Sequence, residues 1–151
     1  MQWLRSAFQD ELDSVTSTLV ELSTLVSDAM DRATHALLTA NLAEAEAVIA
    51  SDDRVDTVQH DLDSRIIDII ARQQPVASDL RALITALRMS ADLERMGDMA
   101  HHVAKITRLR HPQGAVPSEL LLTIEEMGKV AKLIADKAGA VISSRDLDKA
   151  L

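Results

Sequence analysis

Two pairs of acidic residues, each spaced four residues apart, are the strongest candidates for chemistry in this sequence. Glu94 and Asp98 belong to the segment ADLERMGDMAHH, and Asp52 and Asp56 belong to the segment ASDDRVD. Residues four apart lie on the same face of an α-helix, so each pair predicts two carboxylates side by side. Clustered carboxylate oxygens bind hard divalent and trivalent cations. The spacing therefore raises the hypothesis of a metal site.

The two pairs are predicted to face each other because a turn lies midway between them. The segment QQPVASD contains a proline that ends one helix, and its Ser78 is placed to cap the next. If the two helices are antiparallel, Asp52 faces Asp98 roughly 30 Å from the turn. Asp56 then faces Glu94 roughly 24 Å from the turn. Four carboxylates are thus expected at one level of one helix–helix seam.

Carboxylates gathered on an apolar seam repel one another and lose hydration, so a compensating group is expected. Arg54 and Arg95 are placed to form an ion-pair network, and a metal cation is the alternative. His101 lies one turn after Asp98, either as a packing residue or as a nitrogen ligand suited to iron, zinc or nickel. The predicted metal ligands are Asp52, Asp56, Glu94 and Asp98, with His101 as an additional ligand.

Four long helices are predicted to position these residues, because apolar residues recur at steps of three and four. The first helix ends near Asn41, and the others cover about 43–73, 78–109 and 117–144. The second helix is expected to bury Val48, Val55, Leu62, Ile66 and Ile69. The third is expected to bury a stripe of Leu80, Leu83, Leu87 and Ala91. The stripe of the fourth comprises Leu120, Ile124, Met127, Ala131, Ile134, Ala138 and Val141. The chain is therefore predicted to be all-α.

The composition agrees with helices and argues against several functional classes. Apolar residues make up 47% of the 151 residues and aromatic residues 1%, and there is no cysteine for a disulfide or a thiolate metal site. The net charge of −8 argues against nucleic acid as a partner. No apolar run approaches the roughly 20 residues that a membrane span needs. The N-terminal MQWLRSAFQDEL lacks the hydrophobic block of a signal peptide, so a cytoplasmic location is expected.

The region around the turn resembles the signature region of the PhoU family, which regulates phosphate uptake in bacteria. The resemblance rests on a Pro-x-Ala-x-Asp-Leu-Arg turn, Pro75 to Arg81, and on a Glu-Arg-hydrophobic-Gly-Asp motif, Glu94 to Asp98. The segment VIASDDRVD is similar to the family's segment on the preceding helix. The linker RLRHPQGAVP is similar to that of mycobacterial and other actinobacterial members.

This resemblance implies an architecture of two tandem three-helix bundles. Residues 1–110 are then a PhoU-like antiparallel three-helix bundle, residues 111–117 a linker, and residues 118–151 the first helix of an incomplete second repeat. The chain would correspond to about the N-terminal two-thirds of a full-length member.

The resemblance also implies a function without catalysis. Family members dampen phosphate-responsive two-component signalling and link the phosphate-specific ABC transporter to a membrane sensor histidine kinase. In some members the Glu-x-x-x-Asp pairs bind clusters of iron, zinc or nickel. We therefore expect a cytoplasmic metal-binding adaptor that regulates phosphate transport negatively and does not insert into the membrane.

A ferritin-like di-iron carboxylate oxidoreductase is the alternative function. That class takes a Glu-x-x-His motif from each of two helices and a glutamate from each of two others. Asp98-x-x-His101 is the one comparable spacing on the seam, and Glu125 and Glu126 are not followed by histidine three residues later. The regulatory function is therefore preferred.

The fourth helix is expected to need a partner because its second bundle is incomplete. Exposing its seven apolar side chains to water costs several kcal/mol at about 25 cal/mol per Å². The fourth helix can fold back on the first three only if they retain an uncovered apolar face. Otherwise a homo-oligomer is expected, most simply a two-fold dimer. Its interface is predicted to be centred on Ile124, Met127, Ala131 and Ile134.

Overall fold

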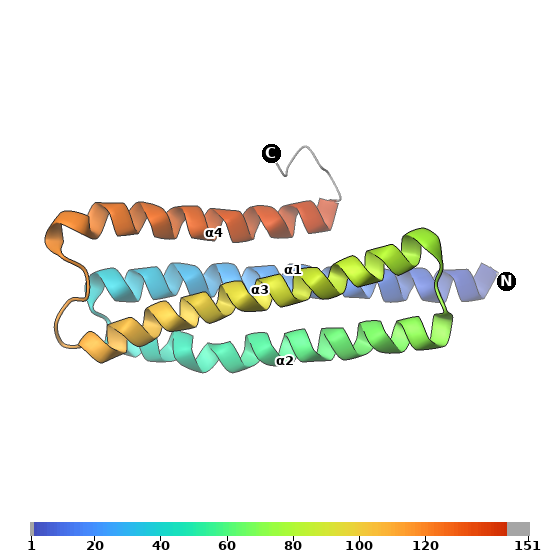
Figure 1. Ribbon diagram of the computed structural model, residues 1–151, viewed down its shortest axis with the longest axis horizontal. Helices are drawn as coiled ribbons and strands as arrows, with labels where there is room; N and C mark the ends of the chain where they lie inside the picture. The colour runs from blue at the N-terminus through green and yellow to red at the C-terminus, as the bar shows by residue number, and fades with distance from the viewer. Residues whose placement is uncertain (1, 145–151) are drawn as a thin grey trace.

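The computed structural model describes the backbone of residues 2–144 and the side chains of residues 7–144. It contains the helices α1 (Gln2–Thr39), α2 (Leu42–Gln73), α3 (Ala77–Arg110) and α4 (Leu121–Ser144), with a 3₁₀ turn, η1 (Ser118–Leu120), before α4. The described residues form no strand, so the predicted all-α class is confirmed. Figure 1 shows the helices side by side, with α4 along α1 on the side away from α2. The end of the predicted 118–151 segment, residues 145–151, lies outside the described residues.

The two tight turns begin their helices in different ways. Asn41 caps α2, because its side-chain oxygen accepts a hydrogen bond from the backbone N–H of Glu44 at 3.1 Å. The prediction that Ser78 caps α3 is wrong. The helix already begins at Ala77, and the cap position is taken by Val76, whose side chain has no hydrogen-bond acceptor. Ser78 therefore lies inside the first turn of α3.

The core is formed by the faces of α1, α2 and α3 that meet along the bundle axis. The stripe predicted for α2 is confirmed, since all five of its aliphatic residues are buried: Val48, Val55, Leu62, Ile66 and Ile69. Four of them, all except Val48, share a core cluster with large residues of α1 such as Leu22 and Val26. The second core cluster, nearer the α1–α2 turn, contains Val48 and otherwise only alanine: Ala29, Ala33, Ala36, Ala45, Ala100 and Ala104.

The stripe predicted for α3 is wrong in part. Leu83 is buried, but Leu80 and Ala91 are exposed, and Leu87 is half-buried. The buried face of α3 includes small and polar residues that an apolar pattern does not count: Ser90, Gly97 and Thr107. Helix α3 contacts both α1 and α2, and its buried face is therefore rotated to one side of the predicted stripe. The acidic residues that continue the predicted stripe, Glu94 and Asp98, consequently lie nearer the edge of the bundle.

Helix α4 finds a partner within the chain, through a face that the apolar pattern does not reveal. It packs on α1 with four buried residues: Gly128, Ala135, Gly139 and Ile142. A Cβ atom at Gly128 would lie 2.2 Å from Thr34 Cγ2, so only glycine allows this approach. Across the same contact Ser27 donates a hydrogen bond to the Asp136 carboxylate at 2.5 Å.

The predicted stripe of α4 is consequently divided between two faces. Ile124 and Ala131 lie half-buried at the edge of the contact with α1, whereas Met127 and Ile134 are 62% and 55% exposed. The dimer interface centred on Ile124, Met127, Ala131 and Ile134 stays a prediction. No helix in the described part of the chain is long and apolar enough to cross a membrane.

Candidate metal centre

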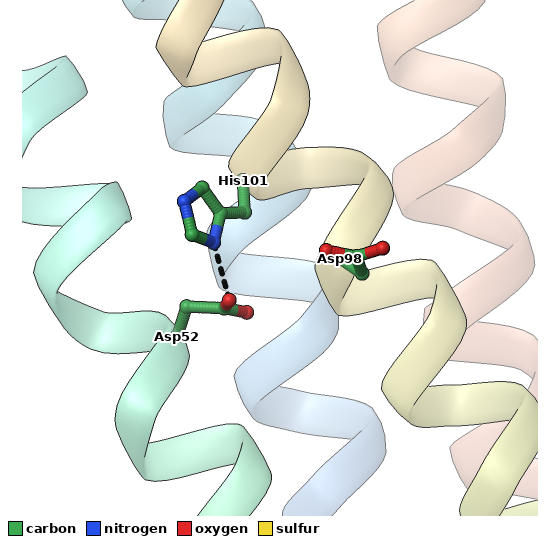
Figure 2. Close-up of side chains that lie close together, drawn as sticks. All are labelled: Asp52, Asp98 and His101. Carbon is green, nitrogen blue, oxygen red and sulfur yellow. Dashed lines mark hydrogen bonds and ion pairs between the residues drawn. The ribbon is translucent and has the colours of Figure 1, made fainter.

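The seam between α2 and α3 brings together three side chains that could hold a metal ion. Asp52 extends from α2, and Asp98 and His101 extend from α3, one turn apart (Figure 2). One ligand atom of each residue lies within 4.8 Å of those of the other two. Among the described residues this is the one such group of three or more acidic or histidine side chains. Its members are three of the five predicted ligands.

His101 and Asp52 form the inner part of this group. The Nδ1 atom of His101 makes a hydrogen bond with the Asp52 carboxylate, and both side chains are largely buried, with 17% and 15% exposed. The Nε2 atom of His101 is buried without a hydrogen-bond partner among the described residues. A buried imidazole nitrogen without a hydrogen-bond partner costs free energy.

Asp98 forms the outer part of the group. Its side chain is 51% exposed, and one carboxylate oxygen lies 3.8 Å from Nε2 of His102, the residue one turn later. His102 was not among the predicted ligands, although its four-residue spacing from Asp98 is the signal that would have placed it beside the site. The group is therefore open to solvent on the Asp98 side and closed on the His101 side.

Glu94 and Asp56 lie close enough to affect the site electrostatically, but they do not join the group of three. Burial raises the pKa of Glu94 above its ordinary value of 4.5, and the charges of Asp56, Asp98 and Asp52 raise it further. The charge of Arg95 acts in the opposite direction and is the weakest of these effects. The repulsion expected among the four carboxylates is thus present at Glu94.

Arginine side chains do not neutralise the acidic cluster directly. Arg54 donates a hydrogen bond to Glu21 of α1 at 2.8 Å, which directs its guanidinium away from the seam. Within residues 7–144, no ion pair joins Arg54 or Arg95 to Asp52, Asp56, Glu94 or Asp98. The geometry therefore does not favour the ion-pair alternative.

The donor set of this site fits a transition metal. Two carboxylates and one imidazole are ligands that iron, zinc and nickel accept. Metal–ligand bonds of about 2.1 Å place neighbouring ligand atoms roughly 3–3.5 Å apart, and the ligand atoms of the three side chains lie within 4.8 Å of one another.

Comparison with known proteins identifies the family. Residues 19–107, which contain α2 and most of α3, match the PhoU domain. The chain belongs to the PhoU family. It is 42% identical over 147 residues to the phosphate-specific transport system accessory protein PhoU homolog 2 of Mycobacterium tuberculosis, covering 97% of this chain and 69% of the relative. The PhoU homolog 1 of Mycobacterium leprae is 40% identical, with 97% and 66% covered.

Solved PhoU structures have the same fold. The crystal structure of PhoU from Pseudomonas aeruginosa has a TM-score of 0.84 and 30% identity, covering 95% of this chain and 68% of that one. For the phosphate transport system regulatory protein PhoU of Streptococcus pneumoniae, the TM-score is 0.82 and the identity 26%, with 95% and 66% covered. The chain thus spans about two-thirds of the length of these PhoU proteins.

Proposed function

We propose that this PhoU-family chain is a non-enzymatic regulator of phosphate-specific transport. The observation that supports this most strongly is its 42% identity, over 97% of its length, to a phosphate-specific transport system accessory protein. We further propose that it acts on the cytoplasmic side of the membrane as an adaptor. Its partners are the phosphate-specific ABC transporter and a sensor histidine kinase, whose response to phosphate it dampens.

In this proposal the seam between α2 and α3 binds a divalent or trivalent metal ion. Asp52, Asp98 and His101 are the ligands, and their ligand atoms already lie within 4.8 Å of one another. Glu94 and Asp56 complete the coordination or orient the ligands from the next turn. The ion would supply positive charge where burial and the neighbouring carboxylates raise the pKa of Glu94, and its role is structural and electrostatic.

The metal site is tested by elemental analysis of protein loaded with iron, zinc or nickel and then desalted. Wild type is expected to retain metal, and Asp98→Ala and Asp52→Ala are expected to lose at least tenfold in affinity, since each removes a ligand. Asp53→Ala is the matched control, because Asp53 is exposed on α2 beside Asp52. Unchanged metal content in the double variant Glu94→Ala, Asp98→Ala would refute the site.

The regulatory role is tested in a bacterium that lacks its own PhoU protein and carries a phosphate-starvation reporter. Expression of the chain is expected to lower reporter output at high phosphate, and Asp98→Ala at equal expression measures the contribution of the metal. Equal output with and without the chain would contradict the role. Oxygen-dependent oxidase turnover by the iron-loaded protein would instead support the di-iron oxidoreductase.

A further inference from the structure

Asp98 is flanked on α3 by two histidines, of which the proposed metal site uses only one. His101 and His102 follow it by three and four residues, and residues at both spacings are neighbours on a helix surface. His101 lies on the side of Asp52, as Figure 2 shows, and His102 lies on the solvent side. The carboxylate of Asp98 therefore has an imidazole on each side.

His102 lies beside Asp98 but outside the group of three. Its Nε2 atom is 3.8 Å from one Asp98 carboxylate oxygen, which is too far for a hydrogen bond. Two atoms that bind the same ion through bonds of about 2.0–2.2 Å lie between roughly 3 and 4.2 Å apart. The separation of these two atoms is therefore one that a single ion can span.

The two imidazole rings are also near enough to bind one ion. Their centroids lie 6.1 Å apart, and their planes are inclined by 38°. The centre of an imidazole bound at about 2.1 Å lies about 3.2 Å from the ion, so two such centres are up to about 6.4 Å apart. His101 is 17% exposed and hydrogen-bonded to Asp52, whereas His102 is 61% exposed. Of the two rings, His102 is the one with space around it.

The number of nitrogen ligands determines which ions such a site prefers. Magnesium and calcium bind oxygen ligands, and carboxylates also suit manganese. Imidazole suits zinc and nickel instead, and zinc most often has four ligands. With His101 alone the site offers two carboxylates and one imidazole. With His102 it offers two of each, which completes the ligand number of zinc.

We propose that His102 is the fourth metal ligand of this site, that it binds through Nε2 from the solvent side, and that the pair of histidines makes the site select zinc over manganese and magnesium. Asp52 and His101 hold the ion from the buried side, and Asp98 and His102 hold it from the open side. This assignment rests on the proposed function, since it adds a ligand to the same ion.

Competition between Zn²⁺ and Mn²⁺ for the 151-residue chain tests this role. His102→Ala is expected to lose at least tenfold in zinc affinity and to lower the ratio of zinc to manganese affinity, since it removes a nitrogen ligand. His111→Ala is the matched control, because His111 is also exposed and follows the end of α3, roughly 14 Å away.

The outcome for Asp98→Ala separates this proposal from the metal site itself. Zinc affinity that falls in Asp98→Ala and stays unchanged in His102→Ala leaves the metal site in place and overturns the role of His102, which is then an exposed ion pair only. Absence of zinc binding by the wild type overturns both.

The variant His102→Cys tests direct coordination. The chain contains no cysteine, so a metal–thiolate bond in this variant can form only at position 102. With one equivalent of Co²⁺, it is expected to show the near-ultraviolet absorption band of a cobalt–thiolate bond, and His111→Cys is expected to lack it. Both positions are exposed, so circular dichroism should show unchanged folding. No band in His102→Cys, or equal bands in the two variants, overturns the proposal.

Discussion

Replacement of Gly128 by alanine tests the contact that holds α4 on α1. The added Cβ would lie 2.2 Å from Thr34 Cγ2, 2.6 Å from Thr34 Oγ1 and 2.9 Å from Thr34 Cβ. Rotation of the threonine side chain moves the first two atoms away, at the expense of its 2.8 Å hydrogen bond to the carbonyl of Met30. It does not move Thr34 Cβ. Because carbon atoms pack at about 3.5–4.0 Å, α4 has to shift outward by up to about 1 Å.

Two opposing effects determine how much Gly128→Ala changes the free energy of unfolding. Overpacking of this kind costs about 1–3 kcal/mol. Alanine in the interior of a helix gains about 0.8–1 kcal/mol over glycine. We therefore expect Gly128→Ala to lower the free energy of unfolding by about 0–2 kcal/mol. At Gly139 the closest atom is Ser23 Oγ at 2.3 Å, and Ser23 Cβ lies at 3.3 Å, so rotation relieves most of the overlap. Gly139→Ala is expected to be nearly neutral.

Urea unfolding followed by circular dichroism measures the free energy of unfolding of both glycine variants. Hydrogen exchange of the α4 amides shows whether the loss of stability is confined to α4. The background variant Thr34→Ala removes two of the three crowded atoms. In that background Gly128→Ala is expected to be less costly, with a coupling energy of about 1 kcal/mol. If both glycine variants gained the full helix propensity of alanine, or if the coupling were zero, the close approach of α4 and α1 would be refuted.

Three further predictions concern charge and metal. The pKa of Glu94 is raised in the folded protein, so its contribution to stability is complete below 4.5 and is lost as the pH rises through the raised pKa. Glu94→Gln should therefore stabilise the metal-free protein at pH 7 by about 0.5 kcal/mol and not at pH 4, by thermal unfolding in chelator. Lys132 and Ser27 lower the pKa of Asp136, whose contribution is present above 3.8 and lost as the pH falls through the lowered value. Ser27→Ala should accordingly destabilise the protein at pH 7 by about 1 kcal/mol and less at pH 3, by urea unfolding. Removal of metal by chelator should leave the helical circular dichroism unchanged and lower only the unfolding temperature, as expected for a ligand that binds the folded state.

The sequence predicts best where large aliphatic residues decide the packing. The stripe of α2 is uninterrupted, so its buried face follows directly from the spacing of Val48, Val55 and Leu62. On α3 the buried face contains Ser90 and Gly97, which fit because they are small. A pattern that counts only apolar side chains misses such positions. The contact of α4 with α1 is missed for the same reason, because it depends on the absence of side chains.

The candidate site shows a similar division. The four-residue spacing and the position of the turn were sufficient to place Asp52 and Asp98 at one level of the seam. They could not show that His101 contacts Asp52 while Glu94 stays outside the group of three, because rotamers and small differences in register decide this. They also could not show that Asp98 lies at the open edge of the seam, since that follows from the displaced buried face of α3.

The residues that set the distance between the helices at the site differ from those that carry charge. A Cβ atom at Gly97 would lie 3.1 Å from Val55 Cγ1 and 3.5 Å from Val26 Cγ2, so α3 packs tightly on its neighbours at this position. Asp98 is the next residue, and it turns outward from that contact. Apolar packing therefore holds the carboxylates at their spacing before any ion binds. The charges of Asp56, Asp98 and Asp52 raise the pKa of Glu94 in an already folded bundle, and under the proposed function this repulsion would favour binding of a cation.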